Sequence, residues 1–207
     1  MKLKYFWLLL SPLLSISILS CAMGGTYPIY LRYKPVKEFS SLKQRLGSSL
    51  GIAPFQDKRS DTLYIGHHSS LRGGSNYFKT EPFPLENAIK ESLNQFISRY
   101  GVKMIPVKDW DGKPESLKKM EIDSILMIEI KRFWTEGRTV AFRTNVNTSI
   151  YLIIHLGVKK EGKVFTRNVY VGKEMKVARL TPERVEATIN QILTEIFDNF
   201  FSNPYQI

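Results

Sequence analysis

Apolar and polar residues alternate along several stretches of this chain, a pattern with the two-residue period of a β-strand. In the N-terminal half, Thr26–Tyr33 shows this alternation most clearly. Leu50–Phe55 and Val102–Val107 are shorter apolar stretches. We expect a strand in each of these three places.

Three long runs with a strand-like pattern follow in the C-terminal half: Ser124–Trp134, Thr139–Val158 and Val164–Val177. The pairs Glu136-Gly137 and Glu161-Gly162 separate these runs, and both have the composition of a tight turn. Strands joined by tight turns lie antiparallel to each other. The pattern therefore predicts a three-stranded antiparallel meander with long strands.

Two other segments repeat apolar residues every three or four positions, as the buried side of an α-helix does. The first, Pro84–Tyr100, is followed by Gly101, and glycine commonly ends helices. The second begins at Thr181-Pro182, with threonine as the N-cap and proline in the first turn, and it ends before Asn203-Pro204. By contrast, Gln56–Thr80 is rich in charge and glycine, which predicts a long loop.

These elements predict an α+β fold. We expect a two-layer sandwich, in which a mostly antiparallel sheet with a long-stranded C-terminal meander carries the two amphipathic helices on one face. Residues 27–203 are expected to form a single domain, because no repeat and no linker-like stretch divides them. A chain of 207 residues with 43% hydrophobic residues is sufficient for one such core.

The start of the chain has a different character, that of a bacterial export signal. Two lysines precede an apolar run that serine and proline interrupt, and the run is too short to span a membrane. Ile18-Leu19-Ser20-Cys21 then resembles a lipobox, the site at which bacterial lipoproteins are acylated on cysteine and cleaved before it. We expect residues 1–20 to be a lipoprotein signal peptide, Cys21 to carry covalent lipid, and residues 21–26 to form a flexible tether.

The chain is basic, with a formal net charge of +11. The predicted signal peptide holds two of the lysines and no acidic residue, so the net charge of the mature chain falls to +9. This charge favours anionic partners, such as phospholipid headgroups, lipopolysaccharide phosphates, acidic glycans or an acidic protein surface. Nucleic acid is not expected for a protein tethered in the envelope. The sequence leaves the oligomeric state open.

Ala22 follows the predicted lipidation site, and the absence of aspartate at this position resembles lipoproteins that are sorted to the outer membrane. We therefore expect a bacterial cell-envelope protein, anchored by its lipid in the outer membrane and facing the periplasm. Its expected partner is an envelope protein or an anionic lipid or glycan.

The pair His67-His68 is the first candidate for a metal site, which an acidic residue of the same segment or His155 would complete. The spacing of these histidines does not match a zinc motif, and adjacent residues of a strand point to opposite faces. His155 lies within an apolar run and is expected to be a hydrogen-bonded residue of the sheet. We therefore predict no metal, no catalytic residue, and no cofactor other than the lipid on Cys21.

Several short motifs, taken in order, resemble those of the YajG-type envelope lipoproteins. They are Tyr27-Pro28-Ile29-Tyr30-Leu31-Arg32-Tyr33 after the lipidated cysteine, Ile52-Ala53-Pro54-Phe55-Gln56-Asp57-Lys58-Arg59, Tyr64-Ile65-Gly66, and a helix that ends in Tyr100-Gly101-Val102. The resemblance covers most of the mature chain by the order of its elements. It implies an envelope lipoprotein without established enzymatic activity, and it supplies no catalytic residues.

The segment Asp57–Thr80 is expected to contact a partner, because exposed aromatic and arginine side chains suit interfaces. Its candidate contact residues are Asp57, Arg59, His67, His68, Arg72, Tyr77 and Phe78. The favoured function is that of a non-enzymatic accessory or scaffold lipoprotein that binds another envelope component. Two alternatives stay open: a lipid- or lipopolysaccharide-binding component of an envelope transport system, and a metal-dependent hydrolase that uses the His67-His68 segment.

Overall fold

The computed structural model describes residues 24–71 and 73–203, so the predicted signal peptide, Cys21 and Arg72 lie outside the described residues. Along the chain the elements are β1 (Thr26–Tyr30), α2 (Leu42–Leu46), β2 (Ser49–Ile52), β3 (Gln56–Asp57), β4 (Gly66–Ser69), β5 (Ser75–Glu81), α3 (Leu85–Ile97), η1 (Ser98–Tyr100), β6 (Lys103–Pro106), α4 (Pro114–Lys118), β7 (Ser124–Val140), β8 (Arg143–Val158), η2 (Lys159–Glu161), β9 (Lys163–Val177) and α5 (Pro182–Ser202).

The strands form one nine-stranded mixed sheet. Its main path runs β1-β5-β4-β7-β2-β6, while β3 pairs with β7, and β8 pairs with both β7 and β9. The two long ladders of β7 with β8 and of β8 with β9 are antiparallel, as is the short β4–β5 pair, and the other pairings are parallel. The long antiparallel ladders hold most of the paired residues, so the predicted α+β class with a long C-terminal meander is confirmed.

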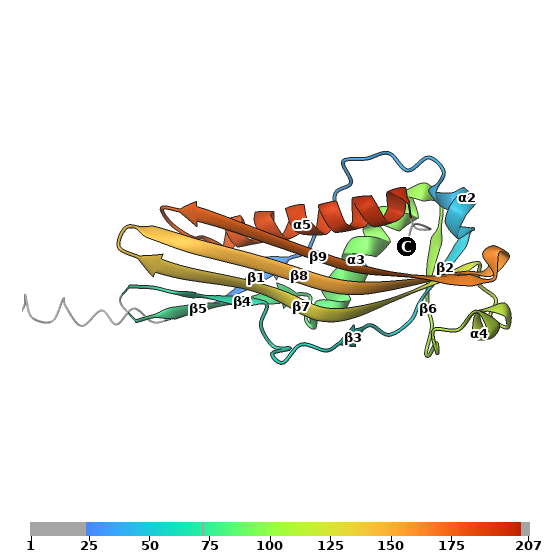
Figure 1. The fold of residues 1–207 in the computed structure, drawn as a ribbon, viewed down its shortest axis with the longest axis horizontal. Coiled ribbons are helices and arrows are strands. Elements are labelled where there is room, and N and C mark those ends of the chain that lie inside the picture. The colour runs from blue at the N-terminus through green and yellow to red at the C-terminus, as the bar shows by residue number, and fades with distance from the viewer. Residues whose placement is uncertain (1–23, 72, 204–207) are drawn as a thin grey trace, which may run out of the picture.

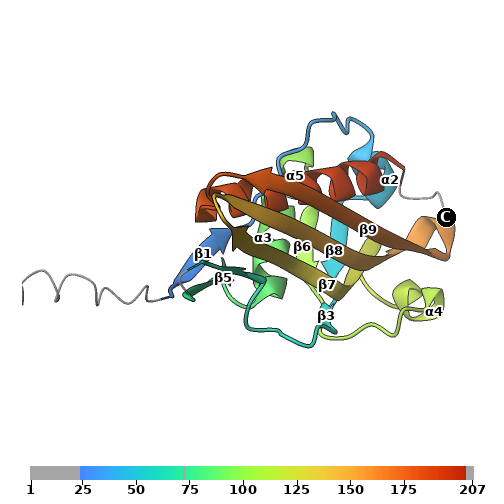
Figure 2. The ribbon, with the colours of Figure 1, turned by 60° about the vertical axis from the view of Figure 1, so that its left-hand side comes forward.

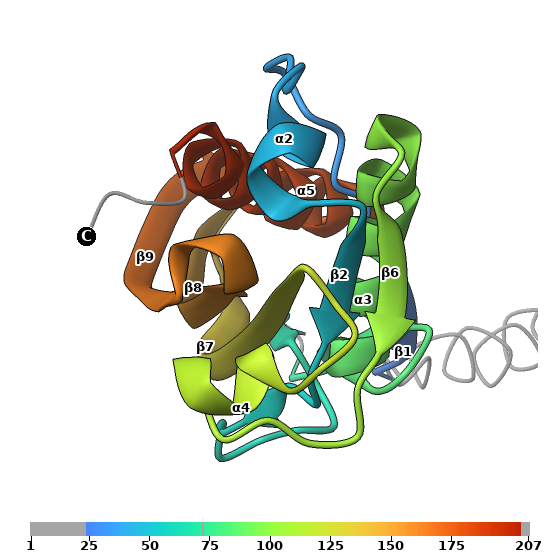
Figure 3. The same ribbon diagram turned by 90° about the vertical axis from the view of Figure 1, so that its right-hand side faces the viewer.

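Both long helices lie on one face of this sheet (Figure 1), and they lie behind β7, β8 and β9 in the view of Figure 2. The end-on view of Figure 3 shows α5 and α4 on opposite sides of these strands. Alternate residues of the long strands, such as Ile128 and Ile130 of β7 and Leu152 and Ile154 of β8, are fully buried against them. The short helix α4 lies on the opposite side at one end of the molecule, where its Leu117 joins a second, smaller core cluster. Within residues 24–71 and 73–203, most of the opposite sheet face therefore carries no helix.

Packed aromatic rings of the core fill the layer between sheet and helices. The ring of Tyr33 lies 4.5 Å from that of Phe96 on α3 and 5.5 Å from that of Phe197 on α5, measured between centroids. Its hydroxyl donates a 2.7 Å hydrogen bond to the buried carboxylate of Asp198. Burial and this hydrogen bond raise the pKa of the Tyr33 hydroxyl far above its usual value. The N-terminal segment is thereby attached to both helices.

Helix α5 begins as the sequence predicts, because the Thr181 side chain accepts a hydrogen bond from the Arg184 amide and Pro182 occupies the first turn. Helix α3 continues into a 3₁₀ turn that Gly101 ends in the left-handed region, with φ of 68°. No helix within residues 24–71 and 73–203 combines the length and the apolar character needed to cross a bilayer.

Two local predictions are wrong. The pair Glu136-Gly137 is not a turn, because β7 continues to Val140 and the reversal falls at Ala141-Phe142. Gly137 fits within a strand because the Leu180 side chain fills the space beside it, where a Cβ would lie only 2.5 Å from Leu180 Cδ2. The predicted long loop Gln56–Thr80 also contains β3, β4 and most of β5. The predicted turn at Gly162 is present, with φ of 60°.

Candidate binding surface on the outer sheet face

The face of the sheet turned away from α3 and α5, called here the outer face, carries polar and aromatic side chains in cross-strand order. The strand registers place one residue from each of five adjacent strands in a single row across it. This row, called the cross-strand row, consists of Tyr77, His67, Glu136, Asn147 and Glu174. Its members come from segments up to 107 positions apart in sequence, so only the folded sheet brings them together.

Aromatic rings gather at the end of this row formed by β4 and β5. Tyr64 and Tyr77 lie 4.7 Å apart between ring centroids, and His67 lies 6.3 Å from Tyr77 and 5.7 Å from Trp134. Tyr77 is 39% exposed. These four residues are called the aromatic cluster. Offset aromatic neighbours at such distances stabilise each other and present a wide apolar surface with polar edges.

A close backbone approach holds β4 against β7 below the aromatic cluster. Gly66 pairs with Thr135, and a Cβ on this glycine would lie 2.2 Å from the Thr135 carbonyl oxygen. The amide of Thr135 donates to the carbonyl of Ile65 at 2.9 Å. Glycine at position 66 is therefore required for β4 to pair here, and this pairing places His67 next to Trp134.

Arg59 fixes the segment that carries Tyr64. Its side chain is 5% exposed, and its Nη2 lies 2.7 Å from Asp57 Oδ2. The same guanidinium donates to the carbonyl oxygens of Tyr64 at 2.8 Å and of Phe133 at 3.4 Å. Five donors in a planar fork suit several acceptors at once. Arg59 and Asp57 thus form a structural clamp that positions the aromatic cluster.

Further tyrosines extend the outer face towards β9. Tyr151 of β8 pairs with Tyr170 of β9, their ring centroids are 6.3 Å apart, and Tyr170 is 67% exposed. Arg132 of β7 lies opposite Tyr151 and donates from Nε to Ser149 Oγ at 2.6 Å. A β-bulge between Ile130 and Arg132 shifts the register here.

Glu129 is the centre of a charged group on the same face. Its carboxylate lies 2.7 Å from Lys58 Nζ, 2.9 Å from Lys131 Nζ and 3.3 Å from His155 Nε2. Hydrogen bonds from Lys58 and Lys131 hold the pKa of Glu129 at about 2. His155 also bonds Thr166 Oγ1 at 2.9 Å through Nδ1, which confirms that it is a hydrogen-bonded sheet residue.

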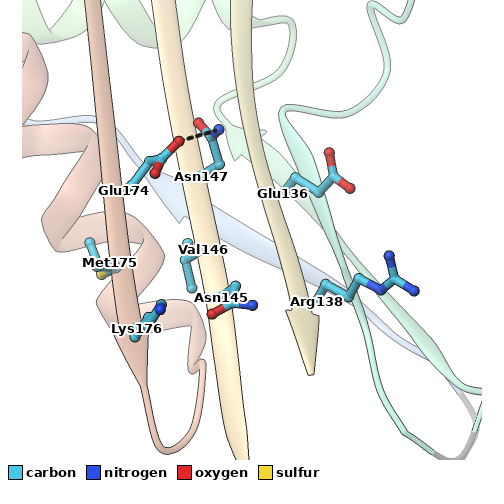
Figure 4. A pocket seen from close by; sticks show the side chains of 8 residues that line it. All are labelled: Glu136, Arg138, Asn145, Val146, Asn147, Glu174, Met175 and Lys176. Atoms are coloured by element: carbon cyan, nitrogen blue, oxygen red, sulfur yellow. Dashed lines mark hydrogen bonds between the residues drawn. The ribbon is translucent and has the colours of Figure 1, made fainter. Parts of the chain in front are cut away.

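An open groove of about 760 Å³ lies towards the β7–β8 turn, and Figure 4 shows its lining. Two successive cross-strand sets contribute to it, Glu136 with Asn147 and Glu174, and Arg138 with Asn145 and Lys176. The Asn147 amide donates to Glu174 Oε1 at 3.4 Å. Carboxylate, amide and cationic groups therefore lie side by side here, a set that can pair with both charges of a polar ligand.

The residues predicted to contact a partner do not share one surface. His67 and Tyr77 lie in the aromatic cluster of the outer face. His68 points to the inner side, where its Nε2 lies 2.8 Å from Thr139 Oγ1 and where burial, followed by the nearby His67, lowers its pKa. Phe78 is 2% exposed and belongs to the core. Arg72 lies outside the described residues.

This arrangement does not provide the metal site considered from the sequence. His67 and His68 are consecutive residues of β4 and point to opposite faces. No group of three or more histidine, cysteine or acidic side chains within residues 24–71 and 73–203 is placed to hold a metal ion. The pair has no shared site in the described part of the chain.

Gly47-Ser48-Ser49-Leu50-Gly51 matches the Gly-x-Ser-x-Gly pattern of hydrolase nucleophiles. Ser49 opens strand β2, whereas the hydrolase motif sits on a turn from a strand into a helix. Its hydroxyl donates to Asp123 Oδ2 at 3.0 Å. Although burial alone would raise the pKa of Asp123, hydrogen bonds from Ser48 and Ser49 lower it. Ser49 therefore helps to anchor the start of β7.

Trp134, Tyr151 and Tyr170 were not predicted as site residues. The sequence does contain a signal for them. Each of these aromatic residues alternates with the buried residues of its strand, at positions where polar side chains are usual, so an aromatic side chain there indicates an exposed contact surface. Tyr64 gave no such signal, since it lies in an irregular segment, which Arg59 holds through the Tyr64 carbonyl oxygen.

The fold and this surface define a two-layer α+β domain with one sheet face that the two long helices do not cover. No protein-family model matches the sequence, and no curated protein matches it. Among solved structures, protein XCC0632 from Xanthomonas campestris, described as DUF330, aligns with a TM-score of 0.53 and 15% identity over 85% of this chain and 91% of that chain. This likeness shows a shared fold.

Two further structures align with lower scores. A protein from Helicobacter pylori, described as a neuraminyllactose-binding hemagglutinin homolog, has a TM-score of 0.47 and 13% identity over 84% of this chain and 91% of that chain. Lipoprotein GNA1162 from Neisseria meningitidis has a TM-score of 0.40 and 11% identity over 72% of this chain and 98% of that chain.

Proposed function

We propose that this chain is a lipid-anchored lipoprotein of the bacterial cell envelope and that it binds a protein partner through its outer sheet face, without catalysing a reaction. The observation that carries the proposal is the aromatic cluster of Tyr64, His67, Tyr77 and Trp134 on a sheet face that the long helices leave uncovered. The anchor itself rests on the lipobox-like sequence before Cys21.

The composition of the outer face supports a protein as the occupant. Tyrosine, tryptophan and arginine are the residues most often found at the energetic centres of protein interfaces. The outer face combines them within a small area, with Arg132 next to Tyr151 and with Tyr170 exposed beside them. A sheet face also offers a broad and rigid surface, which limits the conformational entropy lost on binding.

Charge indicates which kind of protein would bind. Lys58, Lys131 and Arg132 lie on this face, and Glu129 is already engaged by the two lysines. The net charge of the chain is also strongly positive. An acidic envelope protein would complement this surface and would be attracted to it at long range.

Site-specific photo-crosslinking in the living envelope tests this assignment. A crosslinking amino acid at Tyr170, which is 67% exposed on the outer face, should capture one envelope protein reproducibly. Val36 provides the matched control, because it is 84% exposed but lies in the segment that joins β1 to α2, away from the outer face. Equal capture from both positions, or no consistent product from Tyr170, would contradict a binding role for this face.

The anchor has a separate test. Cys21→Ala should abolish membrane retention, because the acyl chains of the lipidated cysteine hold the protein to the bilayer. Circular dichroism of the same variant should report an unchanged fold, since Cys21 precedes β1. A cleaved Cys21→Ala protein that stays in the membrane fraction would refute lipid anchoring. We propose the outer membrane as the site of attachment, with the domain in the periplasm, because Ala22 follows the cysteine.

The two alternative functions have less support from the structure. A lipid carrier needs an apolar cavity, but the space between sheet and helices is filled by rings such as Tyr33, Phe96 and Phe201. A metal-dependent hydrolase that uses His67 and His68 would need both histidines on one side of β4, and they lie on opposite sides.

A further inference from the structure

Several chain connections meet at one end of the molecule, called here the tip. The β7–β8 turn is there, and β4 ends beside it because Ser69 pairs with Arg138. Strand β9 also ends there, since Val177 pairs with Thr144, and the link to α5 follows. Figure 1 shows these ends together at the left of the view.

The tip exposes apolar side chains at its outermost point. Phe142 occupies the β7–β8 turn and is 93% exposed, and Val140 beside it is 53% exposed. Ala141 adopts φ of 54°, in the left-handed region where glycine or asparagine is usual. The turn thus keeps a large aromatic ring in solvent on a strained backbone, and strain of this kind is often retained for function.

Exposed cations lie on the same strand ends as these apolar groups. Arg138, Arg143, Lys176 and Arg179 are all exposed at the tip. The acidic residues near these cations are Glu136, Glu174 and Glu183. Glu136 and Glu174 lie two residues further from the turn than Arg138 and Lys176, and Glu183 lies in the first turn of α5. The tip therefore combines a protruding apolar point with several exposed cations beside it, which is the composition of a surface that enters a lipid headgroup region.

The N-terminal end of the domain is close to the same tip. Gly25 accepts a hydrogen bond from the Tyr77 amide at 2.8 Å and donates to Asn76 Oδ1 at 3.1 Å, so β1 starts beside the beginning of β5. Cys21 precedes Gly24 by three residues, and an extended chain covers at most about 3.6 Å per residue. Three residues of chain therefore allow a lipid on Cys21 to be attached no further than about 11 Å from Gly24.

We propose that the tip docks on the anionic lipid surface of the membrane that holds Cys21. Phe142 and Val140 insert among the lipid headgroups, and Arg138, Arg143, Lys176 and Arg179 contact lipid phosphates. This inference rests on the proposed lipid anchor and adds an orientation to it. The long strands then run away from the bilayer, so that η2 stands about 50 Å from it, as 15 strand residues at about 3.3 Å each imply.

Spin labelling of the acylated full-length mature protein tests the docking. Cys21 is the only cysteine in the sequence, and acylation removes its thiol, so an introduced cysteine is labelled alone. Phe142→Cys carries the nitroxide at the tip, where the apolar label replaces a ring. Lys160→Cys is the matched control, because Lys160 is exposed in η2 at the opposite end. The protein is reconstituted into vesicles of phosphatidylcholine with phosphatidylglycerol, and of phosphatidylcholine alone.

The label at 142 should be accessible to oxygen and shielded from a water-soluble relaxation agent in the anionic vesicles, while the label at 160 stays aqueous. Arg138→Ser combined with Arg143→Ser should lower the ratio of lipid-exposed to aqueous label at 142 roughly 25-fold, because each cation near an anionic surface contributes roughly fivefold. High salt should have a similar effect. Phosphatidylcholine alone should give weak docking.

Three results would overturn the proposal, and they differ in what else they affect. An aqueous label at 142 on protein that remains vesicle-bound refutes docking and leaves the lipid anchor intact. A label at 142 that is shielded from both agents in native membranes but aqueous on vesicles assigns the tip to a protein partner instead. An unmodified Cys21 in mass spectra of the purified protein refutes the anchor, and the docking that rests on it.

Discussion

The carboxylate of Asp57 and the guanidinium of Arg59 form an ion pair 2.7 Å long beneath the outer sheet face, and the same arginine holds the carbonyl oxygen of Tyr64. A short Asp-Lys-Arg element thus connects β3 to the aromatic cluster. The charges of Asp57 and Arg59 are directed into the protein, so this pair acts through the residues that it positions.

Removal of either partner should destabilise the domain. Asp57→Ala leaves the Arg59 guanidinium buried without its counter-ion, and we expect the free energy of unfolding to fall by about 3 kcal/mol. Lys58→Ala is the matched control, because Lys58 is an exposed neighbour whose loss should cost under about 1 kcal/mol. Urea denaturation measures both. An equal effect of the two substitutions would show that the Asp57–Arg59 pair is not a clamp.

Glu129 should make stability depend on pH in the acid range. Its pKa in the folded protein is about 2, below the ordinary value of 4.5, so the unfolded chain takes up a proton first as the pH falls. The stabilisation is complete above about pH 4.5 and is lost between about pH 4.5 and 2. Glu129→Gln should therefore cost about 2 kcal/mol at pH 7 and almost nothing near pH 2.

Thermal unfolding of Glu129→Gln and of the unmodified protein across this pH range measures the difference. Glu161→Gln serves as the control, because Glu161 is exposed in η2 and its nearest cation, Lys160, is 4.0 Å away. It should have little effect at any pH. A Glu129→Gln deficit that persists unchanged at pH 2 would assign the loss to packing rather than to charge.

The sequence pattern was sufficient for elements that bury one continuous face. The strands β7, β8 and β9 and the helices α3 and α5 were predicted because their apolar residues repeat with period two or about 3.6. The sequence pattern failed where a segment is buried by contacts with residues far away in the chain. Strand β4 has the composition of a loop, and it forms because Gly66 allows β7 to approach and because β5 pairs with it on the other side.

The misplaced turn has a similar cause. Glu136-Gly137 has the composition of a hairpin turn, yet Gly137 is needed in the strand to make room for Leu180, 43 residues later in the chain. Phe142 has the same phase in the alternating pattern as the buried Val146, yet it is the most exposed large apolar residue in the described ranges. Local composition does not encode such long-range contacts, so it could not show which residues the folded sheet brings together on the outer face.

Relief of the strained turn should stabilise the protein. Ala141 has φ of 54°, which costs an alanine about 1 kcal/mol or more, and glycine adopts this conformation without that cost. Glycine also adds conformational entropy to the unfolded chain, which offsets part of this benefit. Ala141→Gly should therefore raise the free energy of unfolding by about 0.5–1 kcal/mol. Ala178→Gly, at an exposed site without positive φ, should lose a similar amount. A destabilised Ala141→Gly variant would show that the backbone at the turn is not strained.

Gly66→Ala should separate the aromatic cluster from the rest of the outer face. The added methyl group would lie 2.2 Å from the backbone oxygen of Thr135, which cannot move as a flexible side chain can. Because β4 then loses its fit against β7, we expect a loss of about 2–4 kcal/mol in the free energy of unfolding. Crosslinking to the partner from position 170 should fall as well, since His67 and Tyr77 leave the interface.

Gly172→Ala provides the matched control on the same face. Its new methyl group would lie no closer than 3.4 Å to its nearest neighbour, the Tyr170 hydroxyl, which is an ordinary contact. It should change stability by less than about 0.5 kcal/mol and leave crosslinking intact. If Gly66→Ala unfolds too much to assay, Trp134→Ala removes one ring of the cluster without the backbone clash. Unchanged crosslinking in a folded Trp134→Ala protein would show that the partner does not use the aromatic cluster.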